Sequence, residues 1–525
     1  MKTSVLTNAV IVGIAMAAGV VGDAHALNLN PLGTGQVLIF PYYTVNAGNQ
    51  TLISVVNRTE RGKAIRVRLR EGHNARAILD FNLYLSPFDV WTASVFSLAD
   101  DGPNNPGNLV TTDNSCTVPR VKGNTALPQL SNGNRYTPFP NYRYTGASND
   151  AGPNTLDRTR EGYFEMIEMG EVVDRERTSL TAITHDGGGV PNNCMLVHDA
   201  WLPLGAASAD ATYWSVNALV DMNPPQGGLF GTASIVDALE GTMMSYSAEA
   251  IDGFSDIVQH VRPGEPSPSL SSARTTPETA VARVFHNGEV VTSSYPLSQA
   301  IDAVSALFVQ DEIDNEFITS ASVGGASEWV VTFPTKYAYV DQELVGATAI
   351  APFTQIFPRT SSSTNTGSAA VDSNHTVFNR EEGPNATFCT DPFGCCDFIC
   401  PPSPPVVIPR LGWSSNVVTF NQLATINAGS NILGSRLVMD TETIDVGVFD
   451  GWAIYRFYDA TGTTSGSAIQ FQRMRPDQSG GRWDGVPVTG FLAVSYTNGQ
   501  LTPGVLSNYA AAFKHRGSNH YEMTP

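Results

Sequence analysis

The chain has 525 residues, 42% of them hydrophobic and 15% charged, and its formal net charge is -19. This length allows two to four domains with a large buried core, so disulfides are not needed for folding. The acidic balance argues against nucleic acid as a partner, because there is no broad basic surface to release counterions from phosphates. The composition, rich in Gly, Asn, Ser and Thr, is typical of extracellular β-proteins.

The N-terminus predicts a cleavable signal peptide over residues 1–26. Lys2 supplies the positive charge, Ala9–Val21 is an apolar stretch of suitable length, and Ala24-His25-Ala26 matches a small-x-small cleavage site. No later apolar run is long enough to span a bilayer as a helix. We therefore expect a soluble exported protein at the cell surface, outside the cell or in the periplasm.

Residues 27–110 follow the period of β-strands. Three arginines, Arg66, Arg68 and Arg70, alternate there with apolar side chains, as expected for a strand with one face on a core and one in solvent. The spacing of the turns favours an antiparallel sandwich over βαβ units. The predicted strands are 37–45, 52–57, 64–70, 78–85 and 90–98.

Residues 111–345 predict further strands, one long loop and one helix. The loop, residues 119–154, is rich in Asn, Pro and Gly and is of the kind that carries function or decorates a surface. Asn287-Gly288 predicts a two-residue hairpin turn, and apolar spacing predicts a short helix near 296–308. The predicted strands are 163–173, 180–184, 195–202, 230–236, 242–248, 281–285, 289–292, 328–334 and 336–340.

Residues 346–410 form a connecting segment rich in Ser/Thr, Cys and Pro, and residues 411–525 are β-rich again. The whole pattern predicts a mainly β protein of antiparallel, immunoglobulin-like sandwich domains with long loops and about one short helix. The predicted strands of the last region are 417–420, 443–448, 452–457 and 491–496.

The six cysteines of an exported chain favour disulfides. Cys116 and Cys194 are isolated, and we expect them to pair with each other. The other four would pair among themselves, though not between adjacent residues, whose geometry is strained. A zinc site is the alternative, but the spacing is not that of a zinc ribbon. These four are Cys389, Cys395, Cys396 and Cys400.

Arg66, Arg68 and Arg70 belong to the only dense basic patch of the chain. The patch could dock anionic glycans or the acidic surface of another copy. We favour the simpler interpretation, a solvated strand face whose charges guard an edge against uncontrolled pairing. A sharper hypothesis is that the new N-terminal segment, with Leu27 and Leu29, adds as a strand to a neighbouring copy.

Acidic side chains at Asp311, Asp314 and Glu316 offer oxygen ligands for calcium, but they follow no calcium-loop pattern, so solvated loop charge is favoured. No other cofactor is expected. The signatures of serine hydrolases, zincins, P-loops and c-type haem are missing, which favours a protein that is not an enzyme. A glycosidase needs only two carboxylates, and exposed aromatic side chains could stack on sugars.

Four stretches resemble a family of exported proteins of Gram-negative bacteria that are labelled only as cell surface proteins. These stretches are Gly35–Thr44, Leu83–Thr92, Trp329–Lys336 and Pro487–Phe491. The family has no established activity, so the resemblance implies an exported address and no catalytic residues.

We expect an exported structural or adhesive surface protein that self-associates by strand addition or edge contacts. The alternatives are a secreted protein that binds or cleaves glycans, and a soluble periplasmic partner of another exported protein.

Overall fold

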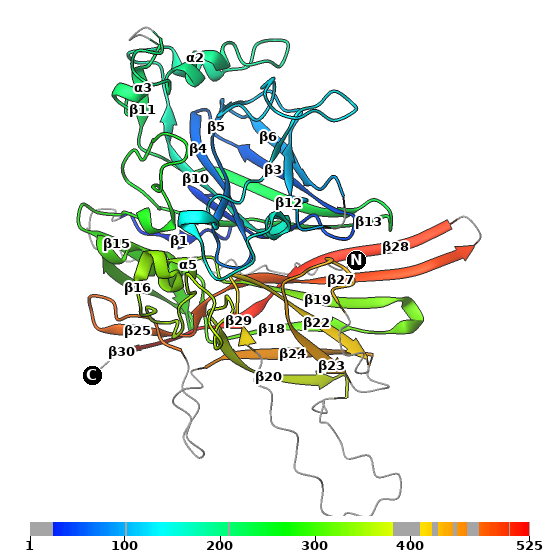
Figure 1. Cartoon of the computed structure of the whole chain (residues 1–525). Coiled ribbons are helices and arrows are strands. Elements are labelled where there is room, and N and C mark those ends of the chain that lie inside the picture. The colour runs from blue at the N-terminus through cyan, green and yellow to red at the C-terminus, as the bar shows by residue number, and fades with distance from the viewer. Residues whose placement is uncertain are drawn as a thin grey trace, which may run out of the picture.

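The computed structural model shows two stacked antiparallel β-sandwiches (Figure 1). Strand makes up 45% and helix 11%, which confirms the mainly β prediction, and none of the described sheets closes on itself. The structure describes residues 25–99, 102–207, 211–381, 410–422, 429–444, 449–458, 472–502 and 505–523.

The first sandwich packs an eight-stranded sheet against a six-stranded sheet, with alternate apolar side chains such as Phe40 and Trp91 filling the core between them. The larger sheet has the order β1 (Asn28–Leu29), β14 (Glu249–Asp252), β2 (Val37–Thr44), β10 (Glu161–Val172), β4 (Gly62–Glu71), β5 (Ala77–Leu85) and β8 (Cys116–Val118), and β11 (Met222–Asn223) also pairs with β10. The smaller sheet has the order β13 (Thr242–Ser247), β12 (Leu229–Asp237), β3 (Asn49–Asn57), β6 (Val90–Phe96), β7 (Asn108–Val110) and β9 (Tyr136–Pro138).

The second sandwich is built from two five-stranded sheets around Trp329, Phe420 and Tyr455. One sheet has the order β21 (Arg410–Leu411), β20 (Val371–Asn379), β24 (Asp450–Phe457), β18 (Glu312–Ile318) and β29 (Arg516–Ser518). The other has the order β23 (Val438–Ile444), β22 (Ser415–Gln422), β19 (Gly325–Thr332), β27 (Thr489–Thr502) and β28 (Val505–Lys514), in which β22 and β23 are parallel.

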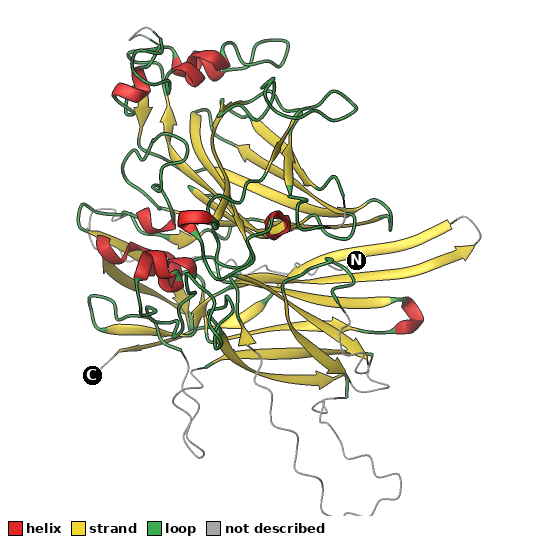
Figure 2. Cartoon of the chain, viewed as in Figure 1, coloured by secondary structure: helices red, strands yellow, loops and turns green. Residues whose placement is uncertain are grey.

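Short helices and two-stranded sheets lie around the two sandwiches and between them (Figure 2). The strand pairs are β15 (Thr279–His286) with β16 (Glu289–Pro296), β17 (Val309–Gln310) with β26 (Val486–Pro487), and β25 (Gly481–Asp484) with β30 (His520–Met523). The helices are α1 (Ser179–Ile183), α2 (Cys194–Asp199), α3 (Tyr213–Val216), α4 (Ala300–Ala306), α5 (Tyr337–Val340) and α6 (Gln342–Val345), with 3-10 turns η1 (Gly146–Ser148), η2 (Leu156–Arg160), η3 (Leu270–Ser272), η4 (Leu297–Gln299) and η5 (Ala321–Val323).

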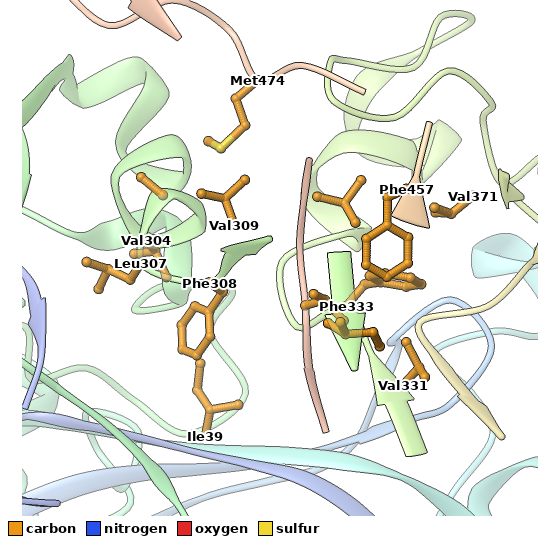
Figure 3. Close-up of a cluster of buried hydrophobic side chains, with 14 of the residues drawn as sticks. Ile39, Val304, Leu307, Phe308, Val309, Val331, Phe333, Val371, Phe457 and Met474 are labelled. Carbon is orange, nitrogen blue, oxygen red and sulfur yellow. The ribbon is translucent and has the colours of Figure 1, made fainter. Parts of the chain in front are cut away.

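The eight-stranded sheet is buried on both faces. Leu38 and Phe40 of β2 face the core of the first sandwich, whereas Val37 and Ile39 belong to the hydrophobic cluster of the second half. Figure 3 shows Ile39 beside Phe308, which lies just after α4. The central strands of this sheet therefore contact protein on both faces. This includes the face for which an alternating sequence pattern predicts solvent.

The local signals that depend on few residues are confirmed. The Asn287-Gly288 turn joins β15 to β16, with φ of 49° and 86° at its two residues. The helix predicted near 296–308 is present as η4 followed by α4.

Three segments predicted as strands are helical instead. Residues 180–184, 195–202 and 336–340 fall on α1, α2 and α5. Each of these helices has at most six residues, a length over which apolar alternation does not distinguish a strand from a helical turn.

The sheets also contain pairs of strands that come from different predicted domains. Strand β10 lies between β2 and β4, so the boundary predicted at residue 110 does not separate two sheets. Strand β18 likewise pairs with β24, across the connecting segment 346–410.

Candidate functional site

The three arginines predicted to face solvent are buried. Arg66, Arg68 and Arg70 are 0%, 4% and 5% exposed, because β4 is a central strand and a loop covers its polar face. In that loop, the Ser267 carbonyl accepts a hydrogen bond from Arg66 Nη1 at 2.9 Å. The predictions of an exposed interaction patch and of a charged strand edge are therefore wrong.

The arginine face is part of a ladder of buried ion pairs. Asp80 Oδ2 lies 2.7 Å from Arg66 Nη2 and 3.0 Å from Arg68 Nε, and Glu165 Oε1 lies 2.9 Å from Arg70 Nη2. Burial alone would raise the pKa of Asp80, but the two guanidinium groups lower it below its usual value. The charges of the ladder are thus satisfied inside the chain and are not available to a partner.

The N-terminal segment pairs within its own sheet. Leu27 is fully buried and its backbone N–H donates to the Val281 carbonyl at 2.8 Å. Asn28 and Leu29 form β1, which pairs with β14. In the folded chain this segment is therefore occupied, contrary to its predicted role as a strand offered to a neighbouring copy.

The predicted disulfide between Cys116 and Cys194 is present and ties β8 to α2. Its Cα–Cα distance of 5.2 Å is ordinary for a disulfide. The four clustered cysteines, 389 to 400, lie outside the described residues, so their pairing stays a prediction. The observed bond is consistent with export, where disulfides persist.

The predicted calcium ligands do not come together. Asp311 accepts a hydrogen bond from Ser518 Oγ at 2.6 Å, while Asp314 and Glu316 line an open groove on the other side of β18. Among the described residues, the one group of three metal-ligand side chains within 4.8 Å is His375, Asp440 and Glu442. Sequence reasoning missed this group, although the alternation Asp440-Thr441-Glu442 signals two carboxylates on one strand face.

The most extensive exposed feature of the first sandwich is the outer surface of the six-stranded sheet, which we call the uncharged face. Burial alternates along β3, β6, β12 and β13, and their pairing places the exposed positions side by side. The outward side chains are Gln50, Leu52, Ser54, Val56, Val90, Thr92, Ser94, Phe96, Phe230, Thr232, Ser234, Val236, Met243, Ser245 and Ser247.

None of these outward side chains is ionisable, although the chain as a whole carries a net charge of -19. Their hydroxyls bond across strands, Ser54 to Thr232 at 2.9 Å and Ser234 to Ser245 at 2.7 Å. Leu52 and Met243 remain 44% and 57% exposed. The surface therefore combines paired hydroxyls with exposed apolar groups, a combination that marks interaction sites more often than plain solvent contact.

The long loop predicted at 119–154 borders this face. Leu130, Asn132 and Asn134 of the loop and Thr92 and Ser234 of the sheet line a shallow groove of about 380 Å³. The loop therefore lies beside the sheet surface and forms one wall of this groove.

A second, more polar groove of about 590 Å³ lies in the second sandwich, along β18. Trp452 is 39% exposed and stacks on Phe378 with ring centroids 4.6 Å apart. Its charged lining consists of Asp314, Glu316, Arg380, Asp450 and Arg516.

Comparisons with protein-family models, with curated proteins and with solved structures find no match to this chain. Among the described residues, no helix has the length and apolar character needed to cross a membrane.

Proposed function

We propose that this is an exported structural or adhesive protein whose copies associate through the uncharged face. The observation that carries the proposal is a broad sheet surface without a single ionisable side chain on a strongly acidic chain. Where two copies meet through acidic surfaces, like charges across the interface cost several kcal/mol. At this face, apolar contact and hydroxyl hydrogen bonds meet no such repulsion.

The size of the face indicates a weak contact. Four strands spaced about 4.8 Å apart, each with about seven residues at about 3.3 Å per residue, give a surface of roughly 400 Å² per copy. Stable dimers usually bury about 800 Å² per partner. We therefore expect concentration-dependent association, which becomes strong only where many copies are held together at a surface.

Replacing Leu52 with Asp should abolish this association. Leu52 lies in the middle of the face, between Ser94 and Ser234. In a two-fold contact the substitution places two unpaired carboxylates in the interface, which costs about 3 kcal/mol or more, or at least about a 100-fold loss of affinity. Sedimentation velocity over a range of concentrations measures the effect.

The matched control is Val290→Asp, because Val290 is an apolar strand residue with 62% exposure on β16, away from the uncharged face. We expect this variant to associate as the wild type does. A wild type that stays monomeric at every concentration, or a Leu52→Asp variant that associates normally, would contradict the proposal.

A second candidate function is glycan binding in the groove along β18. The specific observation is the exposed ring of Trp452, stacked on the half-buried Phe378, beside the carboxylates of Asp314 and Glu316. Sugar rings present an apolar face to aromatic side chains and hydroxyls to carboxylates, so the groove contains both kinds of partner.

Replacing Trp452 with Ala should weaken glycan binding at least about tenfold, because the apolar platform is removed. Titration calorimetry with cell-wall and exopolysaccharide oligosaccharides provides the measurement. Phe285→Ala, which removes an aromatic ring that is 70% exposed on β15, is the control. If no member of the panel binds the wild type, the glycan function is rejected.

A further inference from the structure

Four polar side chains lie together between the two sheets of the second sandwich, at one edge. His375 on β20 and Tyr455 on β24 are cross-strand neighbours in one sheet. Asp440 and Glu442 lie two residues apart on β23, the edge strand of the opposite sheet, and therefore point to the same side. The cluster thus spans the gap between the two sheets at their edges.

The distances in the cluster suit metal coordination. His375 Nε2 lies 3.2 Å from Glu442 Oε2, and the ligand atoms of His375, Asp440 and Glu442 all lie within 4.8 Å of one another. Two ligands bound tetrahedrally at zinc bond lengths are about 3.3 Å apart. The imidazole and the Glu442 carboxylate are already at this spacing, and Asp440 offers the third ligand atom within 4.8 Å of the other two.

Hydrogen bonding alone does not satisfy the cluster. The Tyr455 hydroxyl contacts Asp440 Oδ2 at 2.8 Å and also contacts Glu442 Oε1, but a phenol has one proton to donate. His375 Nδ1 is buried without a hydrogen-bond partner. Among the described residues, no lysine or arginine pairs with either carboxylate. The cluster therefore requires an additional proton or a cation.

We propose that His375, Asp440 and Glu442 bind one zinc ion, which fastens strand β23 to the opposite sheet. An imidazole with two carboxylates is a ligand set that zinc accepts, whereas calcium takes six to eight oxygen ligands and rarely nitrogen. Tyr455 then orients the carboxylates from outside the metal's first coordination layer. Three protein ligands leave a fourth position for water or a ligand.

The test compares zinc content in disulfide-intact, metal-stripped protein dialysed against buffered Zn²⁺ and analysed by atomic emission. Glu442→Gln and His375→Gln should each bind one equivalent less than the wild type, with zinc affinity at this site at least about 100-fold weaker. Counting the difference separates this site from any zinc held elsewhere in the full chain. Equal zinc content in wild type and both variants would overturn the proposal.

The control variant is His198→Gln with Asp199→Asn, which removes another imidazole–carboxylate pair, 3.1 Å apart, and should leave the zinc content unchanged. Stability provides a second measurement that needs no variant. The melting temperature of the wild type should rise with Zn²⁺ and not with Ca²⁺, because a ligand that binds only the folded state stabilises it. No rise with Zn²⁺, or an equal rise with Ca²⁺, would reject a zinc site.

Discussion

Replacing Arg158 with Met should lower the free energy of unfolding by about 3–5 kcal/mol, because it leaves Glu71 buried without its guanidinium partner and Asp150 with only the more distant Arg76, 3.8 Å away. The guanidinium of Arg158, 4% exposed, donates to Glu71 at 2.8 and 3.0 Å and to Asp150 at 2.6 and 2.8 Å. The ring of Tyr144 lies 4.3 Å below it. One side chain therefore neutralises both acids, and urea denaturation at neutral pH measures its loss.

The same substitution should also change how stability depends on pH. Burial alone would raise the pKa of Glu71, but Arg158 and neighbouring hydrogen bonds lower it well below its usual value. An acid whose pKa is lower in the folded state contributes stability above its unfolded pKa and loses it as the pH falls. The destabilisation caused by Arg158→Met should therefore be largest at neutral pH and shrink in acid.

An exposed ion pair serves as the control for this prediction. Arg380 is 62% exposed and lies 3.5 Å from Asp450, so Arg380→Met should cost at most about 0.5 kcal/mol. A loss from Arg158→Met as small as this would show that Glu71 and Asp150 are not held by Arg158 in the folded protein.

The ladder of buried ion pairs formed by Arg66, Arg68 and Arg70 could be predicted from the sequence only in part. The alternation around Arg66, Arg68 and Arg70 correctly predicted a strand, but it suggested solvent for the charged face. The partner carboxylate of Arg70, Glu165, lies 95 residues further along the chain, and the covering carbonyl of Ser267 lies 201 residues from Arg66. The sequence did contain a sign of these partners, because Glu165 and Glu168 are acidic residues in a second, otherwise apolar strand. That this strand pairs with the strand of the arginines can be known only from the order of the strands in the sheet.

Features that depend on only a few residues were more predictable. The Asn287-Gly288 turn needs only two residues that tolerate positive φ, and the Cys116–Cys194 bond follows from an exported chain with two isolated cysteines. The uncharged face was missed for a topological reason. Each strand shows Ser, Thr and apolar residues at alternate positions, yet the face exists only because β12 pairs with β3, and Ser54 and Thr232 are 178 residues apart.

Two histidines have hydrogen bonds that suit the neutral imidazole, and burial lowers the pKa of both. The Ala218 carbonyl, 2.8 Å from His260 Nδ1, can only accept, so Nδ1 carries the proton and Nε2 accepts from Tyr84, 3.0 Å away. Tyr84 in turn accepts from Trp201 at 2.9 Å. His515, which is only partly buried, repeats the arrangement, with Nε2 donating to the Val330 carbonyl at 2.9 Å and Nδ1 accepting from the Asn315 side chain. In both cases a second proton would displace a hydrogen bond that the neutral ring nitrogen accepts.

Acid should therefore destabilise the protein through these imidazoles. Burial lowers the pKa of His260 from 6.5 to about 4, and that of His515 likewise to about 4. Between these values the unfolded chain binds more protons than the folded one, so stability falls as the pH drops from 6.5 to 4. The loss amounts to about 3 kcal/mol for His260 and less for the more exposed His515.

The effect of the histidines is measured from the slope of the unfolding free energy against pH. Comparing this slope between the wild type and histidine variants removes the contribution of the buried carboxylates, some of which change stability with pH in the opposite direction. Near pH 5, the slope falls by about 1.4 kcal/mol per pH unit for each proton that is no longer taken up on unfolding. We therefore expect the slope of the His260→Gln variant to be smaller than that of the wild type by nearly this amount. His515→Gln should flatten it less. His520→Gln removes a surface imidazole with 51% side-chain exposure and is the control. An unchanged slope in His260→Gln would contradict the prediction, because it would show that the pKa of this imidazole does not fall on folding.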